Sequence, residues 1–227
     1  MFLVEKATSI SELNPSMWLS ASNFDGAHPT GEEVITGDAS GGTMDSLGNV
    51  VTSTGTIRVL NDGGYSAYYF DKTNSITSAA KVSDKYTFVS VFRRPTLRGD
   101  LGRFFTSSEG DRLFCSDGEY LGKWYLDNAW VYDQEKSSTQ IEFYIAINNN
   151  GSKNMWDERL NQQLVINKAE GANEWGQTVI GKPILHPEHA TAVYIYEALV
   201  FEYPLDHEQR ELIESLFKIK YCIYHIY

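Results

Sequence analysis

One stretch of the chain decides the fold: Tyr86-Thr87-Phe88-Val89-Ser90-Val91-Phe92-Arg93. Successive side chains of an extended strand point to opposite faces, so Phe88 and Phe92 share one face while Val89 and Val91 share the other. Both faces are therefore apolar, which is typical of a strand that is covered on each side. We predict that this strand lies near the centre of two packed layers.

Further strands are predicted on either side of this stretch. Lys123–Leu126 and Ala129–Tyr132 are rich in aromatic residues, and only Asp127 and Asn128 separate them. This spacing predicts a hairpin, because both connecting residues tolerate the left-handed backbone region that a tight turn needs. Glycine-rich Asn61–Gly64 is typical of another turn. The remaining predicted strands are Thr56–Leu60, Tyr65–Phe70, Ile141–Ile147, a strand through Met155 and Trp156, Val179–Gly181 and Val193–Phe201.

A single helix is predicted near the end of the chain, at about residues 206–221. Asp206 is a good N-cap, and Gln209 completes a capping box with it. The apolar residues that follow have helical spacing and form one stripe, which suits a helix that covers part of a sheet. Many short strands followed by one helix predict an all-β, two-sheet antiparallel jelly-roll sandwich. We expect it to be one domain over residues 1–227.

Charge and hydropathy exclude several function classes. The 227 residues carry 19 Lys and Arg against 30 Asp and Glu, a net charge of −11. Such acidity disfavours binding to nucleic acid or to anionic membrane surfaces. The sequence shows no signal peptide and no apolar run of the roughly 18–20 residues that span a bilayer, and it leaves the compartment open. Cys115 and Cys222 have no metal-ligand spacing, and we expect both to be buried and reduced.

The order of several segments resembles the laminin-G-like, or concanavalin A-like lectin/glucanase, jelly-roll domains of bacteria and phages. The resemblance lies in Leu13–Ser22, Tyr69-Phe70-Asp71, Thr87–Phe92, Ile180-Gly181, Glu197–Phe201 and Pro204–Tyr221. Lys72 stands where the family usually has glycine. The resemblance implies two antiparallel sheets packed face to face, with the concave sheet and its rim loops as the usual ligand surface. It implies no single activity, because this architecture hosts lectins, glycan hydrolases and virion proteins.

The sequence gives no catalytic residues that fit this fold, so we predict that the chain is not an enzyme. Family members that cleave β-glucans carry three acids in a Glu-x-Asp-x-x-Glu pattern on one strand. The nearest pattern here begins at Glu109, and Phe114 stands where the acid/base should be. A glycan-hydrolysing enzyme with an atypical site is the alternative. His186 and His189 flank Pro187 and are interpreted as part of a loop.

No cofactor is predicted, although the resemblance allows one calcium ion at a loop rim. Calcium prefers carboxylate and carbonyl oxygens, and acidic loop residues are plentiful. Because no spacing among them is specific, the metal ligands stay unknown. The candidates are Asp25, Asp38, Asp45, Asp62 and Asp71–Asn74.

Glycan binding without cleavage is the function we favour from the sequence. Aromatic rings stack on the apolar faces of sugars, while neighbouring polar side chains hydrogen-bond the hydroxyl groups. Trp18 and Trp156 are instead expected in the core. The predicted ligand-binding residues are Trp124, Asp127, Asn128, Trp130 and Trp175.

A structural role is the rival hypothesis, with other protein subunits as partners, for example as a virion-surface or head/tail decoration protein. The apolar tail 222–227, which follows Tyr221, favours an extended strand over further helix. It is predicted either to add an edge strand to its own sheet or to pair with a neighbouring subunit in a homo-oligomer or larger assembly.

Overall fold

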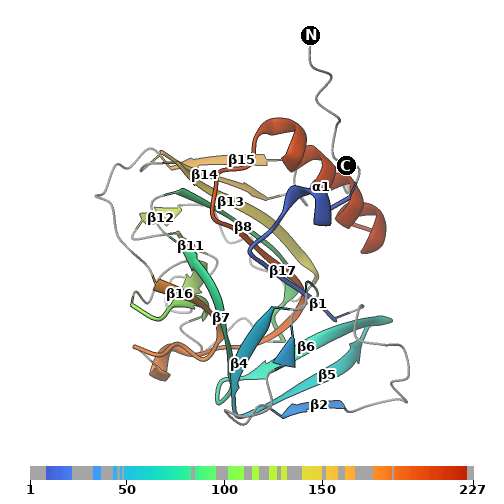
Figure 1. Ribbon diagram of the computed structural model, residues 1–227, viewed down its shortest axis with the longest axis vertical. Helices are drawn as coiled ribbons and strands as arrows, with labels where there is room; N and C mark the ends of the chain where they lie inside the picture. The colour runs from blue at the N-terminus through green and yellow to red at the C-terminus, as the bar shows by residue number, and fades with distance from the viewer. Residues whose placement is uncertain are drawn as a thin grey trace.

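The computed structural model describes residues 9–21, 33–36, 43–44, 47, 49–82, 85–95, 102–109, 114–117, 123–126, 129–131, 140–149, 152–157, 162–166, 176–185 and 187–223. Within these residues two antiparallel sheets pack against each other, and one helix, α1, lies on the other side of the larger sheet (Figure 1). The predicted two-sheet sandwich with a C-terminal helix is confirmed.

The larger sheet, sheet A, has nine strands in the described part of the chain. Their order is β15-β14-β13-β8-β17-β6-β5-β2, and β1 pairs with β17 beside this path. The strands are β1 (Met17–Ser20), β2 (Glu33–Thr36), β5 (Thr56–Asp62), β6 (Tyr65–Asp71), β8 (Lys85–Arg93), β13 (Glu142–Asn149), β14 (Ser152–Asp157), β15 (Gln162–Ile166) and β17 (Ala192–Phe201).

The smaller sheet, sheet B, has eight strands among the described residues, in the order β12-β11-β10-β9-β16-β7-β4-β3. They are β3 (Thr43–Met44), β4 (Val50–Thr54), β7 (Ser75–Val82), β9 (Arg103–Ser107), β10 (Phe114–Asp117), β11 (Lys123–Leu126), β12 (Ala129–Val131) and β16 (Gly176–Gly181). The described residues also contain two short 3₁₀ helices, η1 (Ser11–Leu13) and η3 (Pro187–His189).

The core between the sheets is rich in aromatic rings. Phe88 and Phe92 of β8 point toward sheet B, where their ring centroids lie 4.2 Å from Phe105 and 4.9 Å from Phe104, respectively. Val89 and Val91 belong to a second cluster on the opposite side of β8. The prediction that β8 is covered on both faces is therefore confirmed, and this explains the lack of polar–apolar alternation in its sequence.

The helix α1 (His207–Lys220) covers one end of the outer face of sheet A, the face turned away from sheet B. Asp206 and Gln209 form the predicted capping box, with the Gln209 backbone N–H 2.9 Å from the Asp206 carboxylate. The buried Ile213 and Phe217 belong to the same apolar cluster as Phe143 of β13. Burial of this face anchors the helix, since a helix of 14 residues gains little stability from propensity alone.

The predicted turns agree with the strand pairing. Leu126 of β11 pairs with Ala129 of β12 in an antiparallel ladder, while Asp127 and Asn128 lie outside the described residues. In the β5–β6 hairpin Asp62 pairs with Tyr65, and the two glycines between them have φ values of 63° and 95°. Left-handed values at both central positions are those of a type I′ turn, which suits glycine because it has no Cβ.

Several strands carry little sequence signal of their own. Strands β2, β3, β4, β7, β9, β10 and β15 are not among the predicted strands. In β7, Ser75–Val82, four of the eight residues are serine, threonine or lysine and two are alanine. Such residues form a strand here because neighbouring strands pair with them, and this information lies outside the segment itself.

The chain after α1 differs from the predicted extended tail. The Ile223 backbone N–H bonds the Lys218 carbonyl (3.0 Å) and the Cys222 N–H bonds the Ile219 carbonyl (3.4 Å), the pattern of a Schellman cap. Tyr221 and Ile223 are buried. Residues 221–223 therefore close the helix instead of starting a strand, while residues 224–227 lie outside the described part of the chain.

Cys222 is also exposed, so the expectation that it is buried was wrong. The reason is the cap, which places this residue at the turn between two buried side chains. Trp18, expected in the core, is only half-buried and packs against the cluster beneath α1. No helix in the described residues is long and apolar enough to cross a membrane.

The cap predicts a stabilising substitution. Cys222 has φ = 51°, in the left-handed region where a side chain with a Cβ is strained by about 1 kcal/mol or more. Cys222→Gly should therefore raise the free energy of unfolding by about 1 kcal/mol, or the melting temperature by about 2–4 °C.

Cys222→Ala is the control, because it removes the thiol and keeps the Cβ. Thermal unfolding followed by circular dichroism compares the two variants. If the glycine and alanine variants melt together, backbone strain at this cap is not a factor in stability.

Candidate functional site

Strand β17 changes its neighbour halfway along its length. It pairs with β6 through Ala192–Ile195 and with β1 through Glu197–Val200. On its other side the register with β8 shifts between Ile195 and Glu197, which marks a β-bulge. The bulge places Tyr196 and Glu197, although adjacent in sequence, both in contact with residues on the outer face of sheet A.

The β5–β6 hairpin crosses this outer face. Strand β1 occupies the place beside β17 that the start of β6 would otherwise take. Asp62 at the hairpin tip nevertheless reaches Arg93 of β8, on the far side of β17, through Nε (2.5 Å) and Nη2 (2.6 Å). The Tyr196 hydroxyl donates a further hydrogen bond to the same carboxylate. The hairpin tip must therefore lie over β17.

A row of four side chains crosses the outer face beyond this hairpin tip. Arg58 of β5 pairs with Tyr69 of β6, Tyr69 pairs with Tyr194 of β17, and Tyr194 pairs with Arg93 of β8. The two tyrosine rings have centroids 4.8 Å apart, and the Arg93 guanidinium lies 4.5 Å from the Tyr194 ring centroid. Tyr69, Tyr194 and Arg93 are half-buried and Arg58 is exposed. We call this row, with Asp62, the tyrosine patch.

Arg93 and Asp62 make the inner end of the tyrosine patch rigid. A bidentate guanidinium–carboxylate pair fixes both groups in one plane. Hydrogen bonding to Asp62 raises the pKa of Arg93, so this charge is permanent. Burial, followed by the hydrogen bond to Asp62, raises the pKa of Tyr196, which keeps its phenol protonated and donating. The ring of Tyr194 is thereby held on one side by a charge-compensated arginine.

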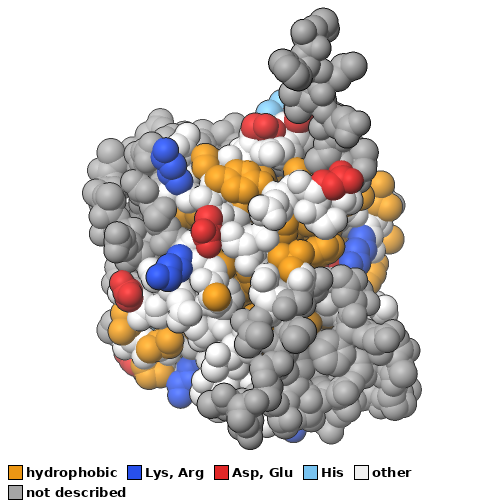
Figure 2. All heavy atoms as spheres, viewed as in Figure 1, with side chains coloured by type: hydrophobic (Ala, Val, Ile, Leu, Met, Phe, Trp, Pro, Cys, Tyr) orange, Lys and Arg blue, Asp and Glu red, His pale blue; other side chains and the backbone are white. Residues whose placement is uncertain are grey.

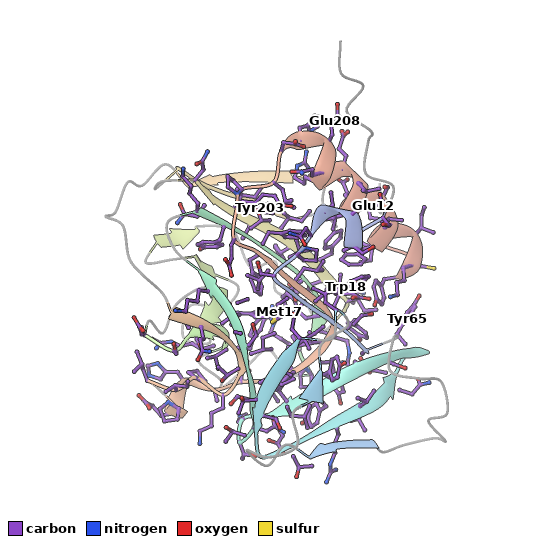
Figure 3. The ribbon with its side chains drawn as sticks, viewed as in Figure 1. Glu12, Met17, Trp18, Tyr65, Tyr203 and Glu208 are labelled. Carbon is purple, nitrogen blue, oxygen red and sulfur yellow. The ribbon has the colours of Figure 1, made fainter. Side chains whose placement is uncertain are left out.

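A second carboxylate, Glu197, fixes the structure next to the patch. It is fully buried and accepts hydrogen bonds from Trp18 Nε1 (2.8 Å), Ser20 Oγ (2.9 Å), Lys220 Nζ (2.5 Å) and the Tyr221 hydroxyl (2.7 Å). Tyr65 joins this cluster to the hairpin, since its ring centroid lies 5.2 Å from that of Tyr221. Figure 3 shows Trp18 and Tyr65 near the C-terminal end of α1. These four donors come from β1 and from the end of α1, so Glu197 ties strand β17 to both elements.

The negative charge of the chain is not gathered into one field on the face seen in Figure 2. There the acidic and basic side chains of the described residues lie apart, among hydrophobic and uncharged groups. The electrostatic potential at a site on this molecule therefore depends more on the nearby side chains than on the net charge, because salt at physiological concentration screens charges over about 8 Å.

The residues that the sequence predicts as ligand-binding are only partly placed. Trp124 lies in β11 opposite Val131, and Trp130 lies in β12 opposite Tyr125. Asp127, Asn128 and Trp175 lie outside the described residues. A ligand role for this set stays a prediction.

The calcium candidates that the structure describes have partners of their own. Asp62 binds Arg93, and the Asp71 carboxylate accepts hydrogen bonds from the Thr73 backbone N–H (3.0 Å) and hydroxyl (2.6 Å). The described residues contain no cluster of three His, Cys, Asp or Glu side chains that could hold a metal ion. Asp25, Asp38 and Asp45 lie outside the described part.

The described catalytic candidates are also dispersed. Glu109 is exposed and follows the end of β9, whereas Phe114 begins β10, so the two do not share a strand. His189 lies in η3, and its ring nitrogen is 3.7 Å from the Glu188 carboxylate. His186 lies outside the described residues.

The tyrosine patch was missed from the sequence. One signal was present, because Tyr65 and Tyr69, like Tyr194 and Tyr196, are spaced by even numbers and fall on one face of a strand. Two features of the tyrosine patch could not be predicted from the sequence. The register that aligns Arg58 with Tyr69 depends on pairing between strands, and the bulge in β17 has no sequence signature.

No protein-family model matches the sequence, and no curated protein sequence is significantly similar to it. Solved structures nevertheless share its fold. Domain 4 of an extracellular GH43 arabinanase from Geobacillus stearothermophilus, in complex with arabinotriose, matches with a TM-score of 0.56 at 14% identity. The match covers 87% of this chain and 97% of that domain.

Two other matches are parts of larger chains. The receptor-binding domain of botulinum neurotoxin type G gives a TM-score of 0.57 at 15% identity, over 91% of this chain and 51% of that one. A Trypanosoma rangeli sialidase in complex with sialic acid gives 0.57 at 14% identity, over 86% and 34%. Together with the sheet topology, these matches confirm the two-sheet sandwich fold that the resemblance seen in the sequence implies.

The buried phenols predict a loss of stability in alkali. Burial and the neighbouring carboxylates raise the pKa values of Tyr196 and Tyr221 above their ordinary value of 10.0. Above that value the unfolded chain releases protons that the folded chain retains, so the stability from these groups is complete below about pH 10 and falls as the pH rises further. Melting temperatures from about pH 8 to about pH 11 measure this decline.

Tyr221→Phe should make the decline shallower, because it removes one of the two retained protons. Tyr203→Phe is a milder comparison, since the pKa of Tyr203 is also raised by burial. A decline that is equally steep in wild type and Tyr221→Phe would show that other groups cause the alkaline transition.

Proposed function

We propose that this chain is a non-catalytic carbohydrate-binding module and that the tyrosine patch is its sugar-binding surface. The observation that carries the proposal is the partly exposed row of Arg58, Tyr69, Tyr194 and Arg93 on the outer face of sheet A. The arabinotriose complex of a domain with the same fold supports it, because this fold is compatible with sugar binding.

The chemistry of the patch suits a sugar ring. The apolar C–H face of a sugar packs on tyrosine rings, and phenol and guanidinium groups hydrogen-bond the hydroxyls at its edge. Tyr69 and Tyr194 lie close enough to form one stacking surface, and Arg93 is held in place by Asp62. A surface arranged in advance loses little side-chain entropy when a ligand binds.

The chemistry of the tyrosine patch supports a non-catalytic role. A retaining glycosidase needs two carboxyl groups about 5–5.5 Å apart across the scissile bond. At the tyrosine patch the Asp62 carboxylate is bound to Arg93 and Tyr196, so it does not supply a free acid/base. The alternative of an atypical hydrolase receives no support from the placement of Glu109.

Two other hypotheses from the sequence remain predictions. A second sugar surface on the β11–β12 hairpin, with Trp124 and Trp130, competes with the tyrosine patch for the same function. No structural match supports a virion-surface or assembly role, and the proposed partner is accordingly a glycan.

Substitution of the patch tests the function. Tyr69→Ala and Tyr194→Ala should each weaken binding about tenfold or more, because each removes part of the stacking surface. Tyr69→Phe should bind nearly as well as wild type, since it keeps the ring. Binding is measured by isothermal titration calorimetry with arabino-oligosaccharides and with ligands chosen from a glycan array.

Trp124→Ala is the matched control for the competing surface, and melting temperatures check that each variant is folded. Loss of binding in Trp124→Ala with none in the two tyrosine variants would move the site to the β11–β12 hairpin. Absence of binding to every glycan at about millimolar concentration would refute the function.

A further inference from the structure

The charge of Arg93 is already compensated within the tyrosine patch. Its Nε and Nη2 donate to the Asp62 carboxylate at 2.5 and 2.6 Å, and both side chains are partly buried, with exposed fractions of 23% for Arg93 and 17% for Asp62. Such a bidentate pair fixes both groups and has no net charge. A carboxylate on a ligand that approached Arg93 would therefore meet a neutral pair and, within it, a negative charge that repels its own.

Arg93 can still donate hydrogen bonds to an uncharged ligand. A guanidinium has five N–H groups, and the pair with Asp62 uses two of them. The Arg93 side chain lies over the ring of Tyr194 and is partly exposed, so its other N–H groups are close to the ring on which a sugar would stack. Hydroxyl oxygens accept such bonds without bringing a charge. This end of the tyrosine patch therefore suits the edge of a neutral sugar.

Another carboxylate lies near the other end of the patch. Asp71 follows Tyr69 by two positions in β6, so the two side chains share a face of the strand, and Asp71 is exposed. Burial and Tyr194 raise the pKa of Tyr69 most, and Asp71 follows. The Asp71 charge has a larger effect on Tyr69 than either nearby cation, Lys72 or Arg58. Both cations also interact with other residues of the chain. A sugar stacked on the two tyrosine rings thus has a carboxylate near each end.

We propose that the tyrosine patch selects uncharged sugars over sugars that carry a carboxylate, and that Asp62 sets this selectivity. This inference rests on the proposed function and specifies the ligand class of the same site. Asp62 acts through Arg93, because it compensates the charge that would attract an acidic sugar and leaves N–H groups that bind hydroxyls. Discrimination between ligands commonly depends on such a repulsive element as well as on attractive contacts.

Calorimetry with matched pairs of sugars tests the selectivity. The probes are a galactose trisaccharide against the corresponding galacturonic acid trisaccharide, and lactose against sialyllactose. In each pair that binds measurably, wild type should bind the neutral member about threefold to tenfold more tightly. An acidic member that binds as tightly as its neutral partner would overturn the proposal. If none of the four probes binds, the glycan array decides: uncharged sugars among the ligands support the proposal, and exclusively acidic ligands overturn it.

The salt dependence of wild-type binding gives the sign of the electrostatic interaction without any substitution. The Debye length falls from about 10 Å at about 0.1 M salt to about 3 Å at about 1 M. Binding of the acidic probe should therefore strengthen as salt screens the repulsion, while binding of the neutral probe changes little. Weaker binding of the acidic probe at high salt would reveal an attraction and contradict the proposal.

Asp62→Asn tests the residue itself, and the measured quantity is the ratio of acidic to neutral affinity. With Arg93 no longer compensated, this ratio should rise about tenfold. A displaced Tyr194 ring would instead weaken both probes alike and leave the ratio unchanged. Glu211→Gln is the matched control, because it removes the same charge from an exposed side chain of α1. An equal rise in both variants would reflect the general field of the protein and reject the role of Asp62.

Asp71→Asn is a second variant, for the case that melting temperatures show Asp62→Asn to be unfolded. The Asp71 carboxylate accepts hydrogen bonds from Thr73, and asparagine keeps an oxygen that can accept them. Removal of this charge should raise the ratio of acidic to neutral affinity about threefold. If neither aspartate variant raises the ratio above that of Glu211→Gln, the proposed selectivity is refuted.

The outcomes separate this inference from the proposed function. If acidic and neutral probes bind equally and Tyr69→Ala weakens both, the tyrosine patch binds sugars and only the selectivity is refuted. If the ratio is unchanged in folded Asp62→Asn, Asp62 does not set it, although the sugar site stands. If Tyr69→Ala changes binding of no sugar, both the site and this inference are overturned.

Discussion

The carboxylate of Glu197 is the group on which the arrangement of sheet A depends. It is fully buried in β17 and receives hydrogen bonds from β1 through Trp18 and Ser20, and from the end of α1 through Lys220 and Tyr221. An ionised carboxylate in such a place is tolerated only when its oxygens are satisfied. The same bonds that satisfy Glu197 also decide where β1 and the helix lie.

The position of β1 in turn shapes the outer face of sheet A. Because β1 pairs with the second half of β17, the start of β6 leaves the sheet and the β5–β6 hairpin lies over β17. Helix α1 covers the opposite end of that face. The tyrosine patch lies on β5, β6, β17 and β8, on the side of the hairpin tip that faces away from α1, so the position of the candidate site follows from where β1 and the hairpin lie.

Much of this architecture could be predicted from the sequence, because the residues of single short segments indicate the structure that each segment adopts. Strand β8 was predicted to be covered on both faces because both faces are apolar. The start of the helix was predicted from the capping box that Asp206 and Gln209 form. The strands that escaped prediction, such as β7, have no such signal and form through pairing. Cys222 and Ile223, the first residues of the predicted extended tail, close the helix instead, because the Schellman cap and the burial of Ile223 override their β-forming composition.

The types of residue at the candidate site could be predicted from the sequence, but the position of the site in the fold could not. Sequence reasoning expected aromatic rings beside polar groups, and it chose tryptophans that were neighbours along the chain. The ligand role of those tryptophans stays a prediction. Strand register, which the sequence does not show, brings Arg58, Tyr69, Tyr194 and Arg93, which are far apart in sequence, into one row.

The construction of the row also limits how it can discriminate between ligands. With centroids 4.8 Å apart, the rings of Tyr69 and Tyr194 form one continuous surface instead of two separate subsites. Stacking on such a surface discriminates little between different sugars, since most sugars have an apolar face. Selectivity must then come from the ends, where hydrogen bonds and charges meet the edge of the ring. Because two hydrogen bonds to Asp62 fix the Arg93 guanidinium, the geometry at that end of the row is set before a ligand binds.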